Sequence, residues 1–299
     1  MSLATIVLFT YNRLDVTKRT IQALQENFLA IESNLIIFSD GPKNESDYLK
    51  VTELRQYLKN IDGFASIEIK ESIQNKGLAD SIISGVTEII NKHGKVIVLE
   101  DDLVTTPNFL NYMNQCLNFY ESNQKILSVC GYGLKIKKPK SYQSEVYLYG
   151  RSSSWGWATW KDRWEKVDWE IKDWEIFKKD KIAIKNFNKN GSDMFKMLKA
   201  TKQGKGNSWA IRFCYHQFKN KSYSIVPFLS MVENIGFTED GTNTKYKFSR
   251  FKIEKDNGTK TDFVLNSDIY PNKEIEKECY KYHSIRIRIY SRIRYILGF

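Results

Sequence analysis

The chain has 299 residues, of which 41% are hydrophobic and 14% aromatic, and it carries a formal net charge of +11. This composition is typical of a packed globular protein and excludes intrinsic disorder as the main class. The excess of Lys and Arg predicts a polyanionic partner: nucleic acid, an anionic membrane surface or a phosphorylated substrate. No apolar run of 18 residues and no signal-like leader occurs, so we expect a cytoplasmic protein. Four cysteines without CxxC spacing and only three histidines argue against a zinc site or a disulfide framework.

The first part of the chain alternates short apolar runs with segments of helical periodicity. Such alternation is typical of crossover units that build a parallel sheet, and it predicts an α/β fold. The expected strands are residues 4–10, 35–39, 66–73 and 95–99, and the expected helices are 15–27, 47–59 and 78–90.

Polar side chains follow each of the first three predicted strands. Because parallel strands end at one edge of a sheet, these groups are expected to line a nucleotide pocket, although each alone would be an ordinary loop residue. No GxGxxG or GxxxxGK[ST] pattern follows the first strand, which argues against a Rossmann dinucleotide site and a P-loop. The residues are Thr10, Tyr11, Asn12 and Arg13 after the first strand, Asp40 after the second and Lys76 after the third.

The fourth predicted strand ends in three acids, Glu100, Asp101 and Asp102. Adjacent carboxylates repel one another unless a cation compensates, and Mg²⁺ or Mn²⁺ typically takes one or two protein carboxylates and completes its shell with water and substrate phosphates. The alternative is a polar turn in which Asp102 is solvated and Thr105 or Thr106 caps a helix.

The second part contains four tryptophans within ten residues, between Trp155 and Trp164. Such a cluster can form rigid walls for a flat ligand such as a pyranose ring, but at least two of the four are also expected to be core anchors. Residues 108–123 are predicted as a helix, 126–131 as a strand, 169–189 as a surface helix or lid, 224–227 as an edge strand and 234–242 as a loop over the site.

The C-terminal segment 283–297 mixes Arg with Ile and Tyr. As a helix it places isoleucines in one stripe beside Arg288 and Arg292, which suits contact with an anionic leaflet on the inner face of the plasma membrane. A strand, or simple packing on the domain, remains open. The stripe is Ile285, Ile289, Ile293 and Ile296.

Seven short segments together resemble GT-A-fold glycosyltransferases, specifically bacterial family-2-like enzymes that are distantly similar to N-acetylglucosaminyltransferase I. The resemblance spans residues 4–244 and implies an open, mostly parallel nucleotide-binding sheet flanked by helices, with an elaborated C-terminal acceptor side. It divides the chain into a nucleotide-sugar-binding half (1–131), an acceptor-side half of the same domain (132–248) and a C-terminal extension (249–299). The segments are FTYNR (9–13), SDG (39–41), NKGL (75–78), VLEDD (98–102), SSSWGWATWKDRW (152–164), NSWAIRF (207–213) and NIGF (234–237).

The resemblance implies metal-dependent transfer of a sugar, of GlcNAc type among the candidates, from a UDP-sugar to a glycan or lipid-linked acceptor of a bacterial surface polysaccharide. It makes Asp102 the ligand of Mn²⁺ or Mg²⁺, Asp101 a contact to ribose or sugar, and Glu100 an orienting group. The other donor-binding residues would be Thr10, Tyr11, Asn12, Arg13, Asp40 and Lys76, and the acceptor or sugar wall would be Trp155, Trp157 and Trp209.

An inverting transfer also needs a carboxylate base for the acceptor hydroxyl. If Trp209 aligns with the family's conserved tryptophan, the base position falls on Asn207, which lacks a carboxylate. The remaining candidates are Asp162, Glu239 and Asp240, and Asp240 is favoured because a loop can carry it to the acceptor. A retaining enzyme stays open. The rival functions are a nucleotidyltransferase and a nucleic-acid-binding protein, and the acids at the rim argue against the latter.

Overall fold

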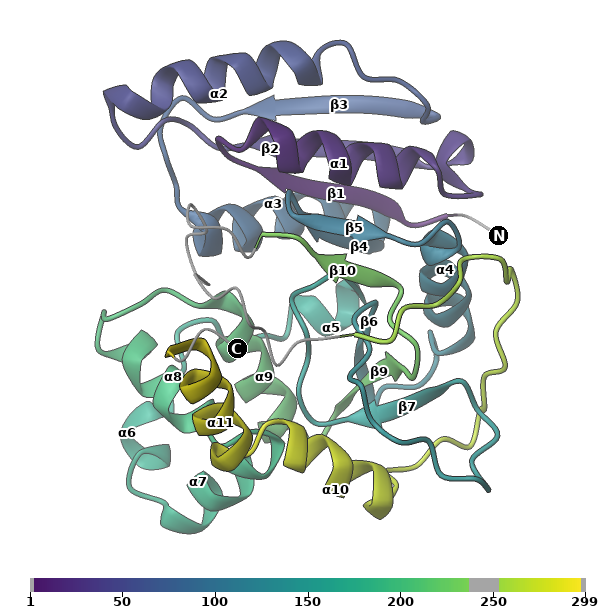
Figure 1. Cartoon of the computed structure of the whole chain (residues 1–299). Coiled ribbons are helices and arrows are strands. Elements are labelled where there is room, and N and C mark those ends of the chain that lie inside the picture. Colours follow the sequence, from purple (N-terminus) through teal and green to yellow (C-terminus); the bar gives the residue numbers. More distant parts are fainter. Residues whose placement is uncertain (1–2, 237–252, 297–299) are drawn as a thin grey trace.

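The computed structural model describes residues 3–236 and 253–296 and has an eight-stranded mixed sheet at its centre (Figure 1). All neighbours pair in parallel except at β8, which runs antiparallel between β4 and β6, and at β7, which is antiparallel to β9 at one edge. The predicted α/β class with a mostly parallel open sheet is therefore confirmed. In spatial order the strands are β3 (Ser66–Glu71), β2 (Asn34–Ser39), β1 (Thr5–Thr10), β4 (Lys95–Glu100), β8 (Trp157–Trp160), β6 (Ile126–Cys130), β9 (Tyr223–Pro227) and β7 (Val146–Tyr149).

A second, two-stranded sheet pairs β5 (Leu103–Thr105) with β10 (Val232–Asn234). The described helices alternate with the strands and continue through the C-terminal part. They are α1 (Leu14–Gln25), α2 (Glu45–Leu58), α3 (Leu78–His93), α4 (Phe109–Phe119), α5 (Lys161–Trp164), α6 (Trp174–Phe177), α7 (Lys181–Phe187), α8 (Met194–Lys202), α9 (Trp209–Lys219), α10 (Lys273–Tyr282) and α11 (Ile285–Ile296), with 3-10 turns at Ala30–Glu32 and Asn188–Asn190.

Two apolar layers cover the two faces of the sheet. One layer packs α1, α2 and α4 on alternate residues of β1, β2 and β4, and it also receives Ile275 and Cys279 of α10. The other layer packs α3 and α9 on the opposite residues of the same strands. Because β1 and β4 are buried on both faces, their near-continuous apolar sequence is the expected one for central parallel strands.

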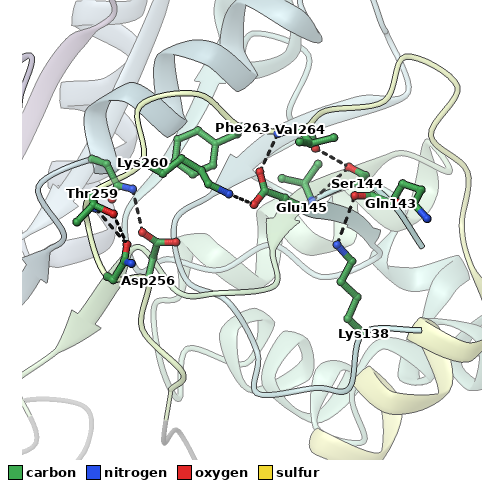
Figure 2. A network of polar contacts seen from close by, with 12 residues as sticks. Lys138, Gln143, Ser144, Glu145, Asp256, Thr259, Lys260, Phe263 and Val264 are labelled. Atoms are coloured by element: carbon green, nitrogen blue, oxygen red, sulfur yellow. Dashed lines mark hydrogen bonds and ion pairs between the residues drawn. The ribbon is translucent and has the colours of Figure 1, made fainter. Parts of the chain in front are cut away.

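The segment between residues 253 and 272 has little regular structure and is attached to the body by polar contacts (Figure 2). Glu145, next to β7, pairs with Lys260 and accepts a 2.8 Å hydrogen bond from the amide of Val264. Asp256 accepts a 2.9 Å hydrogen bond from the side chain of Asn108, just before α4. These contacts hold the C-terminal segment against both halves of the domain.

Two expectations from the sequence differ from the structure. Residues 223–227 form an internal strand, not an edge strand, because β7 pairs on its outer side. Residues 169–189 form short helices around buried Phe177 and Phe187, so the charged pattern marked only their outer face. Of the two alternatives for the segment after 283, the structure has the helix.

Candidate active site at the carboxyl edge of the sheet

The three acids lie at the carboxyl end of β4, beside the end of β1, where Phe9 is level with Glu100. The chain of β1 turns into α1 through Arg13, which is the residue before the helix. Its guanidinium forms ion pairs with both Asp101 and Asp102, and the distance from Arg13 Nη2 to Asp102 Oδ2 is 2.9 Å. The predicted convergence of residues from the first and fourth strands therefore occurs for Arg13 and the two aspartates.

Clustering and loss of hydration change the protonation of these acids. Burial raises the pKa of the Asp101 carboxyl to about 6, although the charge of Arg13 opposes this rise. Loss of hydration, followed by the charges of Asp102 and Asp101, raises the pKa of Glu100 to about 8. The two aspartates in turn raise the pKa of Arg13, so its guanidinium stays charged. The cluster is short of positive charge, which favours an added cation.

Residues of α1, of β10 and of the segment after β10 contact the acids. The hydroxyl of Thr20, on α1, donates a 2.8 Å hydrogen bond to the carbonyl of Asp101. The side-chain amide of Asn234, at the end of β10, lies 3.3 Å from Asp102 Oδ1, and the amide of Ile235 donates to the carbonyl of Asp102 at 2.9 Å. Gly236 passes so close that an added Cβ would lie 2.0 Å from Asp102 Oδ2. Residues 234–236, the described part of the NIGF segment, therefore contact Asp102 directly.

Asp40 braces two loops at the same edge. Its Oδ1 accepts hydrogen bonds from the amides of Gly41 and Lys76, both at 2.9 Å, and its Oδ2 accepts one from Gly77 at 3.0 Å. Gly77 has a φ of +75°, a conformation that favours glycine. The Asp40 carboxylate therefore fixes the start of α3, whereas the side chain of Lys76 is exposed at the rim.

The side chains of Tyr11 and Asn12 converge on Asp47 in the first turn of α2. The Tyr11 hydroxyl and the Asn12 amide donate to its two carboxylate oxygens at 2.7 and 2.8 Å. Thr10 is buried and its hydroxyl lies 3.4 Å from the carbonyl of Phe38. The structure thus places Tyr11, Asn12 and Thr10 in a scaffold beside the acids. Sequence reasoning missed Asp47, whose only signal is its place after the Asn44 cap.

The carboxylates at the end of β4 offer few ligands for a cation. Within residues 3–236 and 253–296 there is no group of three or more His, Cys, Asp or Glu side chains that could hold a metal ion. A Mg²⁺ or Mn²⁺ ion bound mainly by substrate phosphates needs only one or two carboxylates. Asp102 fits that limited role because its side chain is 13% exposed, but an ion there would compete with Arg13 for Oδ2.

The tryptophans divide between core and surface. Trp157 is fully buried and stacks on Trp164 and Trp209 with ring centroids 5.6 and 4.7 Å apart. Because Trp209 is only 3% exposed, neither Trp157 nor Trp209 can form a wall for a sugar, and this expectation is corrected. Trp155 is partly exposed and packs edge-on against Tyr132, so it alone of the predicted wall residues borders open space.

Of the candidates for the general base, Asp162 and Asn207 lie within the described residues. Asp162 follows β8, whose Trp160 pairs with Lys95 at the start of β4, so it lies at the opposite edge of the sheet and pairs with Arg163. The structure therefore contradicts its catalytic role. Asn207 lies before α9 and contacts Arg212 at 2.7 Å and Asp80 at 3.2 Å. Asp80, in the first turn of α3, is a carboxylate that sequence reasoning missed. Glu239 and Asp240 lie outside the described residues.

The fold and the site define an α/β protein with a cluster of three acids and Arg13 at the carboxyl ends of its parallel strands. No family model matches the chain, and no match is found among curated proteins. Similar solved structures include a mannosyltransferase from Pyrobaculum calidifontis in complex with GDP-Man and Mn²⁺ (10% identity, TM-score 0.39, 55% of this chain and 46% of that one). Others are TarS from S. aureus (12%, 0.35, 56% and 30%) and a putative nucleotide-diphospho-sugar transferase from Desulfovibrio desulfuricans (12%, 0.33, 56% and 70%).

The present chain thus spans less than half of the mannosyltransferase and less than a third of TarS. Because these TM-scores are below 0.5, the function proposed below is inferred from the residues of the site rather than from these similarities.

Proposed function

We propose that the protein is a nucleotide-sugar-dependent glycosyltransferase whose donor binds at the carboxyl edge of β1, β2 and β4. The observation that carries the proposal is the meeting of Arg13 with Asp101 and Asp102 where strands β1 and β4 end. In open α/β sheets the carboxyl ends of the strands are the usual ligand site. A cluster of acids with too little positive charge beside it suits a cation, and the neighbouring Arg13 suits a diphosphate.

Each described residue has a role in this proposal. Asp102 holds a divalent ion, Mn²⁺ or Mg²⁺, which when bound supplies positive charge for the departing nucleoside diphosphate. With the ion on Asp102, Arg13 loses part of its contact with that carboxylate and is positioned to contact the diphosphate. The buried carboxylate of Asp101 accepts hydrogen bonds from hydroxyl groups of the ribose or the sugar. Asp40 shapes the nucleotide pocket by fixing the loop that presents Lys76.

The finer assignments follow the sequence resemblance. A UDP-sugar is the favoured donor, a glycan or lipid-linked precursor of a bacterial surface polysaccharide the favoured acceptor, and the transfer is taken as inverting. Asp240 remains the proposed base, because Asp162 lies at the other edge of the sheet and Asn207 is an amide.

The substitution Asp102→Asn tests the proposal. It removes a carboxylate charge while keeping the shape, so we expect turnover of nucleotide sugars to fall by about a hundredfold or more, as for loss of one group that stabilises developing charge. The Mn²⁺-dependent rise in Tm caused by UDP should also disappear, while the Tm of the free protein stays within a few degrees. A matched control is Asp268→Asn, which changes an exposed carboxylate far along the chain. A Mn²⁺-dependent UDP shift that survives in Asp102→Asn contradicts the metal assignment.

Two rivals are separated by their products and ligands. A nucleotidyltransferase would release pyrophosphate from a nucleoside triphosphate, whereas the proposed enzyme releases UDP from a UDP-sugar. A nucleic-acid-binding protein would be stabilised by oligonucleotides and not by UDP with Mn²⁺. The second rival is disfavoured because the acids at this end of the sheet would repel a phosphate backbone.

We also propose peripheral membrane association through α11. None of the described helices is both long and apolar enough to cross a bilayer. Within the described side chains, α11 exposes Ile285, Ile289 and Ile293 together with several arginines and carries no acid. An exposed helix with this composition suits an anionic leaflet, which would place the enzyme beside a lipid-linked acceptor.

A further inference from the structure

A cavity of about 190 Å³ lies behind Trp155, outside the acid cluster. Its lining combines an aromatic pair, a run of three serines, one arginine and His283, which lies between the last two helices. This volume is below the roughly 300–1,000 Å³ typical of pockets for drug-sized ligands, so it suits one small ring. Its main lining residues are Tyr132, Arg151, Ser153, Ser154, Trp155 and His283.

The strand register places this cavity on the same edge as the acids. Trp157 pairs with Val98 of β4 and with Cys130 of β6, and β8 runs antiparallel to both. Because the two strands are antiparallel, continuing this register by two residues puts Trp155 level with Glu100, at the end of β4. The amide of Gly131 continues the pairing with a 2.6 Å hydrogen bond to the carbonyl of Gly156.

A short path of contacts links the two sites. Asn234 of β10 contacts Asp102, and Val232 of the same strand lies 3.6 Å from the position of a Cβ built on Gly156. Gly156 is next to Trp155 in the chain. A ligand in the cavity would therefore lie on the side of the acids that faces the second half of the domain, across β10 from Asp102.

The polar floor of the cavity is charge-compensated. Arg151 contacts Asp193 at 2.8 Å, and the two side chains are only 17% and 8% exposed. Ser152 continues inward through a chain of hydroxyls to Ser128 and Ser224, at 3.1 and 2.8 Å. The serine hydroxyls and the compensated guanidinium can bind the hydroxyls of an uncharged sugar, and the partly exposed indole can pack on its apolar face. Because the guanidinium already pairs with a carboxylate, the cavity suits such a sugar better than it suits an anion.

The C-terminal segment completes the wall. The ring of His283 stacks on Tyr149 with centroids 6.0 Å apart, and the Tyr282 hydroxyl contacts the Tyr132 hydroxyl at 2.8 Å. The hydroxyl of Ser192 donates to the carbonyl of His283 at 3.0 Å. Because α11 begins at Ile285, two residues later, the helix with exposed isoleucines starts at the rim of this cavity.

We propose that this cavity is the acceptor subsite and binds an uncharged pyranose ring stacked on Trp155. The inference rests on the proposed glycosyl transfer and specifies the acceptor side of it: a neutral terminal sugar, whose attached lipid would leave toward α11.

The experiment measures the binding of simple sugars in solution by saturation-transfer NMR. The probes are the methyl glycosides of glucose, galactose, mannose and N-acetylglucosamine, with methyl glucuronide as the charged comparison. We expect at least one neutral glycoside to bind the full chain. Trp155→Ala should weaken this binding about tenfold, the effect of losing one good aromatic contact. Ser154→Tyr, which fills the cavity without removing Trp155, should abolish it. Tyr270→Ala, which removes a 70% exposed aromatic elsewhere, should leave it unchanged.

Donor binding serves as the independent readout. The UDP-dependent rise in Tm should persist in Trp155→Ala and in Ser154→Tyr, because neither residue contacts the acids. If no neutral glycoside binds, if the glucuronide binds better, or if binding is equal in Ser154→Tyr and the unchanged protein, the acceptor subsite is wrong while the donor assignment stands. If UDP has no effect but the glycosides bind as expected, the proposed transfer is wrong and the sugar site remains.

Discussion

At the scale of single residues, the mostly buried pair of Arg151 and Asp193 affects both the stability of the fold and the charge beside the cavity. Although burial alone raises the pKa of Asp193, the Arg151 guanidinium holds it below its ordinary value of 3.8. A carboxyl with a depressed pKa in the folded state stabilises the fold above that ordinary value, and the contribution is lost as the pH falls below it. At neutral pH the Asp193 carboxylate therefore compensates the charge of Arg151, which lines the cavity.

The substitution Asp193→Asn should lower the free energy of unfolding by about 2–4 kcal/mol at neutral pH, because it leaves a mostly buried guanidinium without its carboxylate. The loss should shrink between pH 7 and pH 3, as the unfolded carboxyl of the unchanged protein becomes protonated. Urea denaturation at the two pH values measures both effects. The exposed pair of Lys178 and Glu175 supplies the control, since Glu175→Gln should have little effect. An equal loss at both pH values would show that the charge of Asp193 does not contribute to the free energy of unfolding.

At the scale of elements, α11 presents exposed apolar and basic side chains. Ile285 is 60% exposed and Ile289 is 53% exposed. Near the start of the helix, Arg288 contacts Ser192 at 3.4 Å. Arg286 and Arg292 are exposed and available to lipid headgroups.

The double substitution Arg286→Glu with Arg292→Glu should weaken binding to phosphatidylserine vesicles at least about tenfold, because each arginine near an anionic surface contributes about 1 kcal/mol. Co-sedimentation with these vesicles, compared with vesicles of neutral lipid, measures the effect. The control Lys50→Glu with Lys125→Glu makes the same change in net charge on exposed residues outside α11. Equal binding of both double variants would remove α11 as the anchor, since net charge alone would then explain the attraction.

The Trp cluster shows why a motif does not reveal the direction of its side chains. In β8 the residues alternate between the two faces, and Trp157 points into the layer beneath α9, where it meets Trp164 and Phe213. Trp155 precedes the strand and remains partly exposed. The sequence placed both in one block, but only the pairing of β8 between β4 and β6 decides which of them reaches a cavity.

At the scale of the whole molecule, the largest apolar cluster joins all three regions expected from the sequence. The sheet joins β4 to β8, and the larger apolar cluster contains Ile6, Tyr147 and Ile275, one from each of the three regions expected from the sequence. The boundaries at 131 and 248 therefore remain a prediction about function rather than about separate folding.

This continuity predicts a single unfolding transition. The seven tryptophans all lie between Trp155 and Trp209, so their fluorescence reports the second region, whereas far-UV circular dichroism reports helices and strands throughout. We expect the two signals to have the same urea midpoint. The isolated fragment 1–131 should not fold, because it lacks β8 and leaves the long edge of β4 unpaired. Two separate midpoints would show that the regions fold independently.

By itself, the sequence determined the alternation of strands and helices in the first half and the position of Glu100, Asp101 and Asp102 at a strand end. Both features are local: the alternation follows from the periodicity of apolar residues, and the acids come directly after a buried strand in the sequence. It also indicated that Arg13 and the acids would share an edge, because parallel strands end together.

Only the tertiary structure decided which of the other polar residues belong to the site. Asp162 was a candidate for the general base, yet the antiparallel direction of β8 carries it to the end of the sheet opposite the acids. Asp47 and the buried pair of Arg151 with Asp193 were not predicted, because their partners are distant in the chain. Strand order and direction are set by packing between distant segments, and no local pattern encodes them.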